Sequence, residues 1–578
     1  MLKIINHFFN FCQKENKIRF YKSIVLTFIE SLFNSLKIAA IFVFITGAIE
    51  GSNMTNISLI TLGIMLVSII GSYIVRYFSM MLQTEGGYDT CARKRMEIAE
   101  HLRYVPMGYY NENSIGQVLS VTTNTMQFLE NLATRVIMLV SSAVLSTLVI
   151  TIIILIFDYR IGLVLVAGLL LFALVTHLLM KKSDKISYLK YQSDENLITQ
   201  ILEYIEGINE VKSYKLVGKK CKKLNEANDK SADINYKMEI NFIPYIGLQS
   251  MIIKLFGVLI IFLSIMFNIQ GTMPLANTLI MIISSFIIYA TLENASSFTA
   301  LLRNIETCIK KGENILKSPQ MNLEGDKEAP INHNIEVNNV SFSYGKKKII
   351  DNVSLKIKEN TVTAFVGPSG GGKTTLTKLI ARFFDVDEGS ITLGGKNIKD
   401  YNYDTLMKNF SFVFQNVYLF KDTIANNIRF GTRDASMDEV IEAAKKANCH
   451  EFIMKLEKGY DTVIGEDGIN LSGGERQRLS IARAMMKDAP IIVLDEATAN
   501  VDPENEKELV EAIGALTKNK TIIMIAHRLK TVRNADQIFV IENGKIREQG
   551  NHSELIKKDG LYKKFISLRE KATSWKIS

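Results

Sequence analysis

The chain has 578 residues, of which 47% are hydrophobic and 22% are charged, and its formal net charge is +9. This length exceeds one ordinary domain. The five cysteines are scattered, which argues against a disulfide framework or a cysteine-based metal cluster. Residues 1–315 contain several long hydrophobic runs, whereas the remainder has the mixed pattern of a soluble α/β protein. We therefore predict two domains of different kinds.

Six hydrophobic runs in residues 1–315 are each long enough to cross a bilayer as a helix, which takes about 20 apolar residues. The predicted transmembrane helices are Ile24–Ile49, Ser58–Phe78, Arg135–Phe157, Ile161–Met180, Ile243–Phe267 and Ala276–Leu292. The residues before the first span, Met1–Tyr21, are basic, aromatic and amphipathic, which is typical of a helix at a membrane surface. The first domain is thus predicted to be a six-helix all-α transmembrane domain.

The connections between these spans differ in charge. The short connections Glu50–Ile57, Asp158–Arg160 and Asn268–Leu275 hold one arginine and no lysine. The two long connections are basic, with Arg93, Lys94, Arg95 and Arg103 in the first and many lysines in the second. The positive-inside rule therefore places the long connections and both termini in the cytosol. Since the basic residues flank spans, the net charge reflects membrane topology, and no nucleic-acid partner is expected.

Two lysines, Lys37 and Lys254, fall in the middle of predicted spans. A charge at the centre of a spanning helix costs about 2.5–3.5 kcal/mol on insertion scales, so it usually faces a partner or a cavity. One alternative is internal pairing with Glu30 or Glu293. The other is a cavity that attracts an anionic substrate, such as a carboxylate-bearing siderophore or an acidic lipid. The sequence leaves both open.

Residues 316–332 place Pro319, Gly325 and Pro330 among charged residues, which is typical of a linker. The second domain then occupies residues 333–578. Within it, the apolar run Thr361–Val366 is predicted to form a strand, and Leu376–Arg382 an amphipathic helix.

A glycine-rich loop connects this strand to this helix, which is the context that a phosphate-binding P-loop needs. Glycines let the backbone approach a phosphate closely, and the helix N-terminus favours negative charge. Lys373 is predicted to bind the β- and γ-phosphates, and the Thr374 hydroxyl to ligate Mg²⁺. The predicted ATP-binding residues of the loop are Gly367, Pro368, Ser369, Gly370, Gly371, Gly372, Lys373, Thr374 and Thr375.

Two further segments complete a pattern. The apolar strand Ile491–Leu494 leads to Asp495 and Glu496, and an acid at the carboxyl end of such a strand lies where open α/β sheets bind ligands. Together with Leu471–Arg478 and the P-loop, this pattern resembles the signature and Walker B motifs of ATP-binding-cassette (ABC) proteins. The resemblance implies that Asp495 binds Mg²⁺ and that Glu496 polarises the water that attacks ATP.

The resemblance implies roles for other residues. Tyr344 matches the aromatic residue that stacks on adenine in ABC ATPases. Gln415 matches the glutamine that senses Mg²⁺ and faces the transport domain. His527 matches the histidine that contacts the γ-phosphate. One departure is Gly371, where many members of the family have serine, and this glycine would make the loop slightly more flexible.

ABC proteins bind ATP between the P-loop of one cassette and the signature of another. The resemblance thus implies a working unit of two half-transporter chains that uses ATP and Mg²⁺, and it leaves a homodimer and a heterodimer both open. The signature residues that would contact ATP are Ser472, Gly473 and Gly474. The further partners would be membrane lipid and the transported small molecule, which would be anionic if Lys37 and Lys254 line a cavity.

Two cytosolic segments, Met107–Gly116 and Tyr204–Tyr214, resemble the coupling helices of exporter-type ABC proteins. The whole chain therefore resembles an exporter-type half-transporter of the cell membrane, with its cassette in the cytosol. The predicted function is ATP-driven export of a small molecule, lipid, drug or peptide. A siderophore importer on the same fold is the alternative. A non-transporting ABC ATPase is a third reading, against which the six spans argue.

Overall fold

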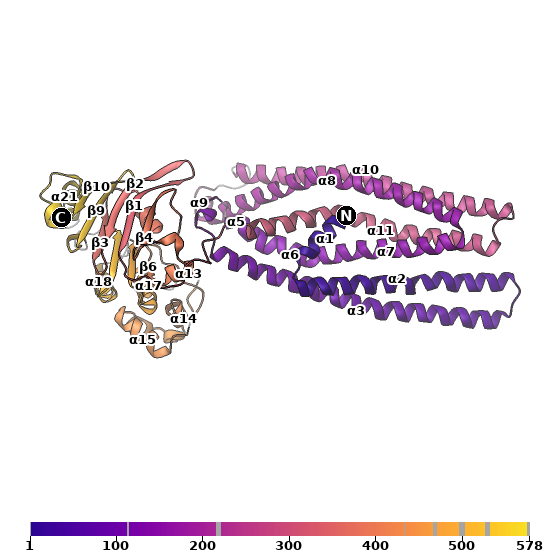
Figure 1. The fold of residues 1–578 in the computed structure, drawn as a ribbon, viewed down its shortest axis with the longest axis horizontal. Coiled ribbons are helices and arrows are strands. Elements are labelled where there is room, and N and C mark those ends of the chain that lie inside the picture. The colour runs from indigo at the N-terminus through magenta and orange to yellow at the C-terminus, as the bar shows by residue number, and fades with distance from the viewer. Residues whose placement is uncertain are drawn as a thin grey trace. The chain divides into compact units, whose positions relative to one another are not determined.

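The computed structural model describes residues 2–112, 115–215, 221–432, 434–465, 471–495, 503–525 and 532–574. The chain divides into two compact units (Figure 1). Unit 1 consists of Met1–Arg103 and Tyr110–Ser318, and unit 2 of Tyr104–Tyr109 and Pro319–Ser578. A short segment of the N-terminal half of the chain is therefore part of the C-terminal unit.

Unit 1 is helical. Its long helices are α2 (Lys14–Ile49), α3 (Met54–Arg103), α7 (Thr134–Phe157), α8 (Tyr159–Glu206), α10 (Lys222–Ile269) and α11 (Leu275–Leu316). Its short helices are α1 (Leu2–Phe11), α5 (Ile115–Ser120), α6 (Met126–Phe128) and α9 (Ile208–Ser213), while α4 (Gly108–Glu112) begins in unit 2. The π-helical turns η1 (Val121–Thr125) and η2 (Leu129–Ala133) lead into α7.

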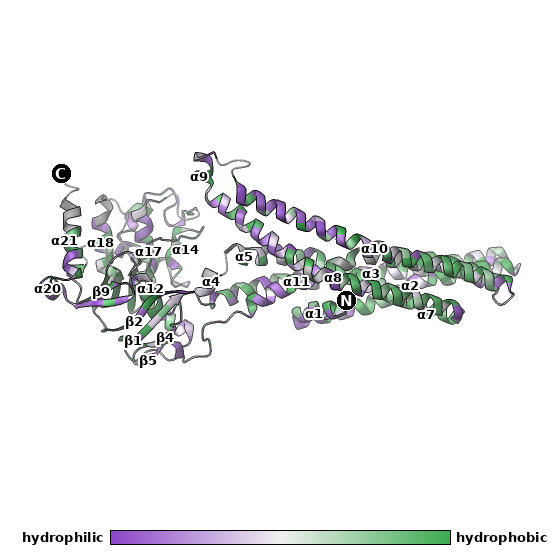
Figure 2. Cartoon of the chain, turned by 90° about the horizontal axis from the view of Figure 1, so that it is seen from above, coloured by the Kyte–Doolittle hydropathy of each residue, from purple (hydrophilic) through white to green (hydrophobic). Residues whose placement is uncertain are grey.

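Five helical stretches of the described residues are long and apolar enough to cross a membrane: Lys14–Ile49, Met54–Arg103, Val118–Phe157, Tyr159–Lys182 and Lys222–Ile269. They contain the first five predicted spans. The sixth prediction overlaps a shorter apolar stretch at the start of α11, Leu275–Ile287. Figure 2 shows α8 and α10 apolar at one end and hydrophilic at the end near α9. At 48 residues each, both helices extend well beyond the length that a bilayer needs.

The amphipathic N-terminus packs within unit 1. Ile4 and Phe8 of α1 are only 3% and 1% exposed, and they share a hydrophobic core with Phe20 of α2. His7 Nε2 lies 2.9 Å from Glu313 Oε1 of α11, which ties α1 to the far end of the unit's sequence. The structure therefore differs from the prediction of a helix at a membrane surface, because other protein side chains already cover the apolar face of α1.

Unit 2 contains a six-stranded sheet of order β10-β9-β3-β8-β7-β6, in which the described neighbours are parallel except for β9 and β10. Its strands are β3 (Val362–Val366), β6 (Phe410–Val413), β7 (Ile491–Asp495), β8 (Thr521–Ile525), β9 (Gln537–Glu542) and β10 (Lys545–Gly550). A four-stranded antiparallel sheet of order β2-β1-β4-β5 contains β1 (Ile335–Tyr344), β2 (Lys347–Ile357), β4 (Glu388–Leu393) and β5 (Lys396–Asn397).

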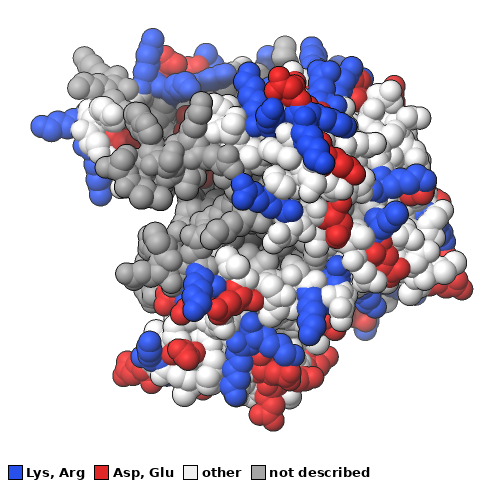
Figure 3. Space-filling model, turned by 90° about the vertical axis from the view of Figure 1, so that its left-hand side faces the viewer, with Lys and Arg blue, Asp and Glu red and all other residues white. Residues whose placement is uncertain are grey.

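Helices and short 3₁₀ turns surround these sheets. They are α12 (Lys373–Ile380), η4 (Ile398–Asp400), α13 (Tyr403–Lys408), α14 (Ile424–Arg429), α15 (Met437–Lys446), α16 (His450–Met454), η5 (Gly459–Asp461), α17 (Gly473–Lys487), α18 (Pro503–Thr517), α20 (His552–Leu555) and α21 (Leu561–Ser574). Viewed from the left-hand side of Figure 1, this end of the molecule carries intermixed basic and acidic side chains, so charges of opposite sign lie next to each other there (Figure 3).

The six-stranded sheet is covered on both faces. Ala364 and Val366 of β3 belong to one hydrophobic core, and Phe365 between them belongs to another. Successive strand residues point to opposite faces, so a strand buried on both sides is apolar at nearly every position. This explains the nearly continuous apolar run before the P-loop, in which Thr363 is a buried exception, and the apolar run before Asp495. The prediction of a helical transmembrane domain followed by an α/β domain is confirmed.

Candidate nucleotide-binding site

The loop between β3 and α12 adopts a backbone conformation that glycine accepts most readily. Gly367, Gly370 and Gly372 have φ angles of 146°, 77° and 106°, a region that other residues rarely adopt. A Cβ on Gly367 would lie 2.0 Å from the carbonyl oxygen of Ile541 in β9. The glycines thus let the loop curve tightly against β9 and lead directly into α12, whose N-terminus favours an anion.

Backbone hydrogen bonds hold Gly371, the residue at which the loop departs from the pattern of the family. The Gly371 N–H donates to the Pro368 carbonyl at 3.2 Å, and the Gly371 carbonyl accepts from the Gly544 N–H at 3.1 Å. A Cβ on Gly371 would lie 2.9 Å from the Ile541 carbonyl oxygen. Gly371 is therefore closely packed, and these contacts limit the extra flexibility that a glycine would otherwise give.

The first residues of α12 present a cation and a hydroxyl at the loop. Lys373 is only 6% exposed, and its Nζ donates to the carbonyl oxygens of Gly367 at 3.0 Å and Pro368 at 2.8 Å. Thr374 is exposed, whereas Thr375 is 8% exposed. A buried ammonium beside an exposed hydroxyl at a helix N-terminus is suited to bind phosphate and a metal ion together.

Strand register brings the other predicted residues to the same edge of the sheet. Asp495 of β7 pairs with Ile525 of β8, which in turn pairs with Phe365 of β3, two residues before the loop. On the other side of β7, Val413 of β6 pairs with the residue before Asp495, and Gln415 follows two residues later. Because these strands are parallel, their carboxyl ends meet at one edge.

The predicted catalytic residues Glu496 and His527 lie outside the described residues. Glu496 directly follows Asp495, the last residue of β7, and His527 comes two residues after Ile525, the last residue of β8. Both strands end at the edge that carries the P-loop.

Tyr344, the predicted adenine-stacking residue, ends β1 and is half-buried. Its ring makes edge-on contacts with Phe342 at a centroid distance of 5.0 Å and with Phe384 at 5.3 Å. Phe342 and Phe384 are each 6% exposed. Edge-on packing against two buried rings is a favourable aromatic arrangement, and it fixes the orientation of the Tyr344 ring.

The signature segment begins α17. Ser472 is the N-cap residue: the Glu475 N–H donates to Ser472 Oγ at 3.3 Å, and the Ser472 N–H donates to Glu475 Oε2 at 2.8 Å. Ser472 and Gly473 are exposed, whereas Gly474 is buried. Further along α17, Gln477 Nε2 donates to the Phe414 carbonyl at 3.2 Å, next to Gln415. The signature helix is therefore hydrogen-bonded to the segment of the predicted metal-sensing glutamine.

The sequence analysis did not identify an aromatic groove that lies beside this segment. The groove has a volume of about 470 Å³, and its lining includes Phe414, Tyr418, Phe420, Phe430 and Arg483. Phe412 also lines the groove, and the other four aromatic side chains are 41–57% exposed, although rings of this size are usually better covered. Burial lowers the pKa of Arg483, a guanidinium that lies 5.3 Å from the Phe430 ring centroid.

The segment Tyr104–Tyr109 is anchored within unit 2. The Met107 N–H donates to the Phe383 carbonyl at 3.0 Å, and the Tyr104 carbonyl accepts from the Met321 N–H at 2.8 Å. The Tyr104 hydroxyl also donates to Asp404 Oδ2 at 3.0 Å. This segment overlaps the first predicted coupling segment, in which α4 begins, and α9 lies within the second.

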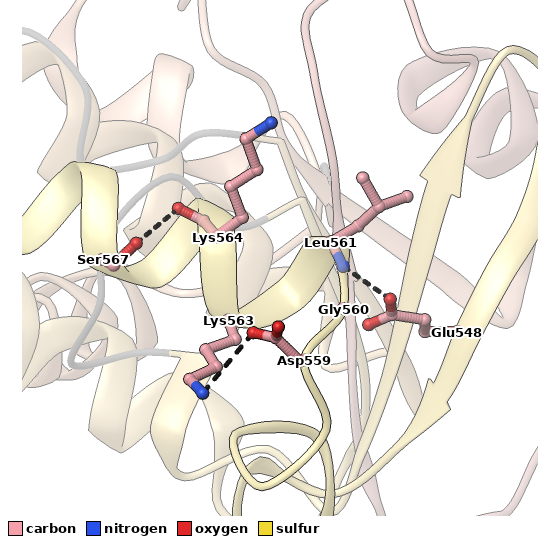
Figure 4. A pocket seen from close by; sticks show the side chains of 7 residues that line it. All are labelled: Glu548, Asp559, Gly560, Leu561, Lys563, Lys564 and Ser567. Carbon is pink, nitrogen blue, oxygen red and sulfur yellow. Dashed lines mark hydrogen bonds and ion pairs between the residues drawn. The ribbon is translucent and has the colours of Figure 1, made fainter.

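A separate pocket of about 600 Å³ lies at the start of α21 (Figure 4). Glu548 accepts hydrogen bonds from the backbone N–H groups of Leu561 at 2.6 Å and Tyr562 at 3.1 Å, and thereby caps α21. A Cβ on Gly560 would lie 2.1 Å from Glu548 Oε1, so a larger residue there would displace the capping carboxylate. Asp559 and Lys563 pair at 3.6 Å. None of these lining residues belongs to the predicted nucleotide site.

The two lysines of the predicted spans are exposed in the single chain. Lys37 Nζ donates to Asn34 Oδ1 at 2.9 Å, one helical turn away. Glu30 lies within electrostatic range of Arg76 of α3 and of Lys37. The sequence analysis did not consider Arg76, although this residue lies inside a predicted span. The Glu293 side chain lies outside the described side chains, so its predicted pairing stays a prediction.

Two protein families match this chain. The family of ABC transporter transmembrane regions matches residues 20–291, and the ABC transporter family of ATP-binding domains matches residues 350–499. The second match contains the P-loop, Gln415, the signature segment and Asp495. Fold and site together define a multi-pass membrane protein that hydrolyses ATP to drive transport.

The relatives cover most of the chain. The ATP-dependent lipid A-core flippase of Francisella tularensis subsp. tularensis (strain SCHU S4) is 35% identical over 514 residues, 86% of this chain and 83% of the relative. The protein of the same name in Syntrophus aciditrophicus is 32% identical over 520 residues, 87% of this chain and 85% of the relative. The chain therefore belongs to the ABC transporter family, with its transmembrane region and ATP-binding domain in one polypeptide.

A solved structure has the same fold. The structure of a bacterial Atm1-family ABC exporter with ATP bound has a TM-score of 0.87 and 23% sequence identity, and the match covers 96% of this chain and 98% of that chain. These relatives favour export over the siderophore-importer alternative, and the predicted exporter-type architecture is confirmed.

Proposed function

We propose that two chains of this kind, identical or different, bind two ATP molecules between the P-loop of one cassette and the signature of the other. The preformed P-loop is the observation that carries this proposal: three glycines with positive φ angles and a buried lysine at the start of α12. Ser472 and Gly473 support it, since both are exposed at a helix N-terminus and are thus accessible to a nucleotide held by a partner.

Each residue of the site then has a role in phosphoryl transfer. Lys373 and the N–H groups of the loop bind phosphate, and Tyr344 stacks on adenine. Glu496 polarises the attacking water, and His527 contacts the γ-phosphate. Such a reaction depends on positioning and charge neutralisation rather than on covalent chemistry.

The donor set at the edge of the sheet fits Mg²⁺. Thr374, Asp495 and Gln415 offer a hydroxyl, a carboxylate and an amide oxygen, and Mg²⁺ prefers oxygen ligands of this kind. When bound, the ion would neutralise charge on the β- and γ-phosphates. The residues of this chain would hold the phosphates and orient the water.

Two features support coupling between the cassette and the transmembrane region. Tyr104–Tyr109 is hydrogen-bonded into unit 2, and the aromatic groove beside Gln415 offers apolar surface on the same unit. Both coupling segments would lie in the cytosol, together with the cassette and both termini, in accordance with the basic residues of the long connections.

We further propose that the transported molecule is a lipid or another amphiphile with an acidic head group. The names of the relatives support the lipid class, and the cations Lys37, Arg76 and Lys254 in the apolar helices support an acidic head group. ATP binding would favour one orientation of the transmembrane region only through its higher affinity for that state.

The test is lipid translocation in vesicles that contain the purified protein. A fluorescent acidic phospholipid should change leaflet when Mg²⁺ and ATP are added, and a neutral phospholipid should do so more slowly. The translocation rate measured with the Lys373→Ala variant is the background rate. Equal rates for the wild-type and this variant would exclude lipid transport, and equal rates for the two lipids would exclude selection of an acidic head group.

A further inference from the structure

Asp351 of β2 lies outside all of the motifs described above. Its carboxylate forms ion pairs with Lys348 of the same strand and with Lys545 at the start of β10, the latter at 2.9 Å. The Asp351 N–H donates to the Gly544 carbonyl at 3.0 Å. A single residue therefore joins the first residues of β2 to the turn between β9 and β10.

This turn supports the P-loop directly. The Gly544 N–H donates to the Gly371 carbonyl at 3.1 Å. There is little free space between this turn, β2 and the P-loop. A Cβ on Gly544 would lie 2.3 Å from the Ile349 carbonyl oxygen, and a Cβ on Gly372 would lie 2.8 Å from Ile350 Cδ1. The turn is thus packed between β2 and the P-loop, so a displacement of the turn relative to β2 would displace the loop.

The other partner of Asp351 belongs to the hairpin that carries the adenine-stacking tyrosine. In the antiparallel pairing of β1 with β2, Lys348 lies opposite Ser343, and Tyr344 lies opposite Lys347. The Asp351 carboxylate therefore contacts two cations, one beside Tyr344 and one beside the support of the P-loop. These are the two ends of the predicted ATP site.

We propose that Asp351 is a positioning residue for ATP, whose ion pairs hold the Tyr344 hairpin and the P-loop support at the separation that one nucleotide spans. This inference rests on the proposed function, because it takes Tyr344 as the adenine contact and the P-loop as the phosphate contact. Asp351 itself touches neither part of the nucleotide. Its effect is to reduce the ordering that ATP must impose on binding.

The expected size of the effect on ATP binding follows from the solvent exposure of the Asp351–Lys545 ion pair. Asp351 is 33% exposed, and exposed ion pairs are worth little. Removing the charge should raise the KM for ATP about two- to fivefold, the range that such pairs allow. Asp351→Asn keeps the backbone hydrogen bond to Gly544, so this variant isolates the contribution of the charge.

The experiment compares the ATPase activity of the full chain in nanodiscs for the wild-type, Asp351→Asn, Lys545→Met and the double variant. We expect both single variants to raise the KM for ATP with little change in kcat or Tm. The double variant should be no worse than Asp351→Asn alone, because that change already removes the Asp351–Lys545 ion pair. High salt should shrink the difference between the wild-type and Asp351→Asn, because it screens the pair.

Glu336→Gln is the matched control. Glu336 pairs with Lys356 at 2.8 Å on the same four-stranded sheet, and both side chains are exposed. An unchanged KM in Asp351→Asn, additive effects in the double variant, or an equal rise in Glu336→Gln would each overturn the inference. Lys373→Ala distinguishes a failure of the Asp351 proposal from a failure of the proposed nucleotide site. If Lys373→Ala still binds ATP normally, the proposed nucleotide site itself is wrong.

Discussion

The Lys373 ammonium lies 2.8 Å from the carbonyl oxygen of Pro368, inside the loop that leads into α12. Carbonyl groups hold an ammonium by charge-assisted hydrogen bonds without neutralising it. The Lys373 ammonium is thereby held inside the loop, at the N-terminus of α12, where a phosphate would bind.

Lys373→Ala should weaken ATP binding at least about tenfold, because a hydrogen bond to a charged group is worth about 1.5–3 kcal/mol. Nucleotide affinity would be measured by fluorescence titration of the purified protein. Lys378→Ala is the control, since Lys378 lies in the last turn of the same helix, away from the loop. Equal affinities for the wild-type and Lys373→Ala would show that the glycine loop does not bind phosphate.

Glu496→Gln should abolish ATP turnover and retain ATP binding. The change preserves the shape of the side chain and removes the carboxylate that polarises water. Phosphate release and nucleotide-trapped dimers are the two measurements. Near-normal hydrolysis by the variant would remove Glu496 from its proposed role.

Gly367→Ala should disrupt the P-loop, because the new Cβ would meet the Ile541 carbonyl oxygen at 2.0 Å and the φ angle is 146°. We expect a loss of about 1–3 kcal/mol of stability together with loss of ATP binding. Gly514→Ala is the matched control: Gly514 lies inside α18, and a Cβ there would meet nothing within 4 Å. This change should instead stabilise the protein by about 0.5–1 kcal/mol. Thermal unfolding and nucleotide titration would distinguish the two variants.

The double variant Lys37→Gln/Lys254→Gln tests the role of the span lysines. If the lysines attract an acidic substrate, stimulation of ATPase activity by that substrate should be lost, while basal activity remains, since the cassette is unchanged. If they are structural partners of carboxylates, Tm and expression should fall instead. A lower Tm without a substrate-specific defect would exclude the cavity interpretation.

The Asp351 ion pairs should not depend on pH in the physiological range. Hydrogen bonds from Lys348 and then from Lys545 hold the pKa of Asp351 below its ordinary value of 3.8. A depressed carboxyl pKa gives a stabilisation that is present above the ordinary pKa and is lost as the pH falls through the folded-state pKa. The KM ratio between Asp351→Asn and the wild-type should therefore be constant from pH 6 to pH 8. A KM ratio that changes across this range would contradict positioning by a carboxylate that stays charged throughout.

Local sequence was sufficient to predict the parts of the site that depend on backbone conformation and on where strands end. A loop whose glycines allow positive φ angles before Lys373, and an apolar strand that ends at Asp495, each have few structural solutions. The edge at which they meet also follows from sequence, because parallel strands place their carboxyl ends together.

Long-range packing decided the remaining features. The amphipathic pattern of Met1–Tyr21 is equally suited to lipid and to a protein core, and only the folded unit shows Ile4 and Phe8 buried against α2. The inclusion of Tyr104–Tyr109 in unit 2 depends on hydrogen bonds to residues more than 200 positions away. Asp351 belongs to none of the sequence motifs. Its two lysine partners come together only when β2 and β10 pack around the turn at Gly544. Sequence periodicity determines which face of an element is apolar, whereas the partner of that face is set by the tertiary fold.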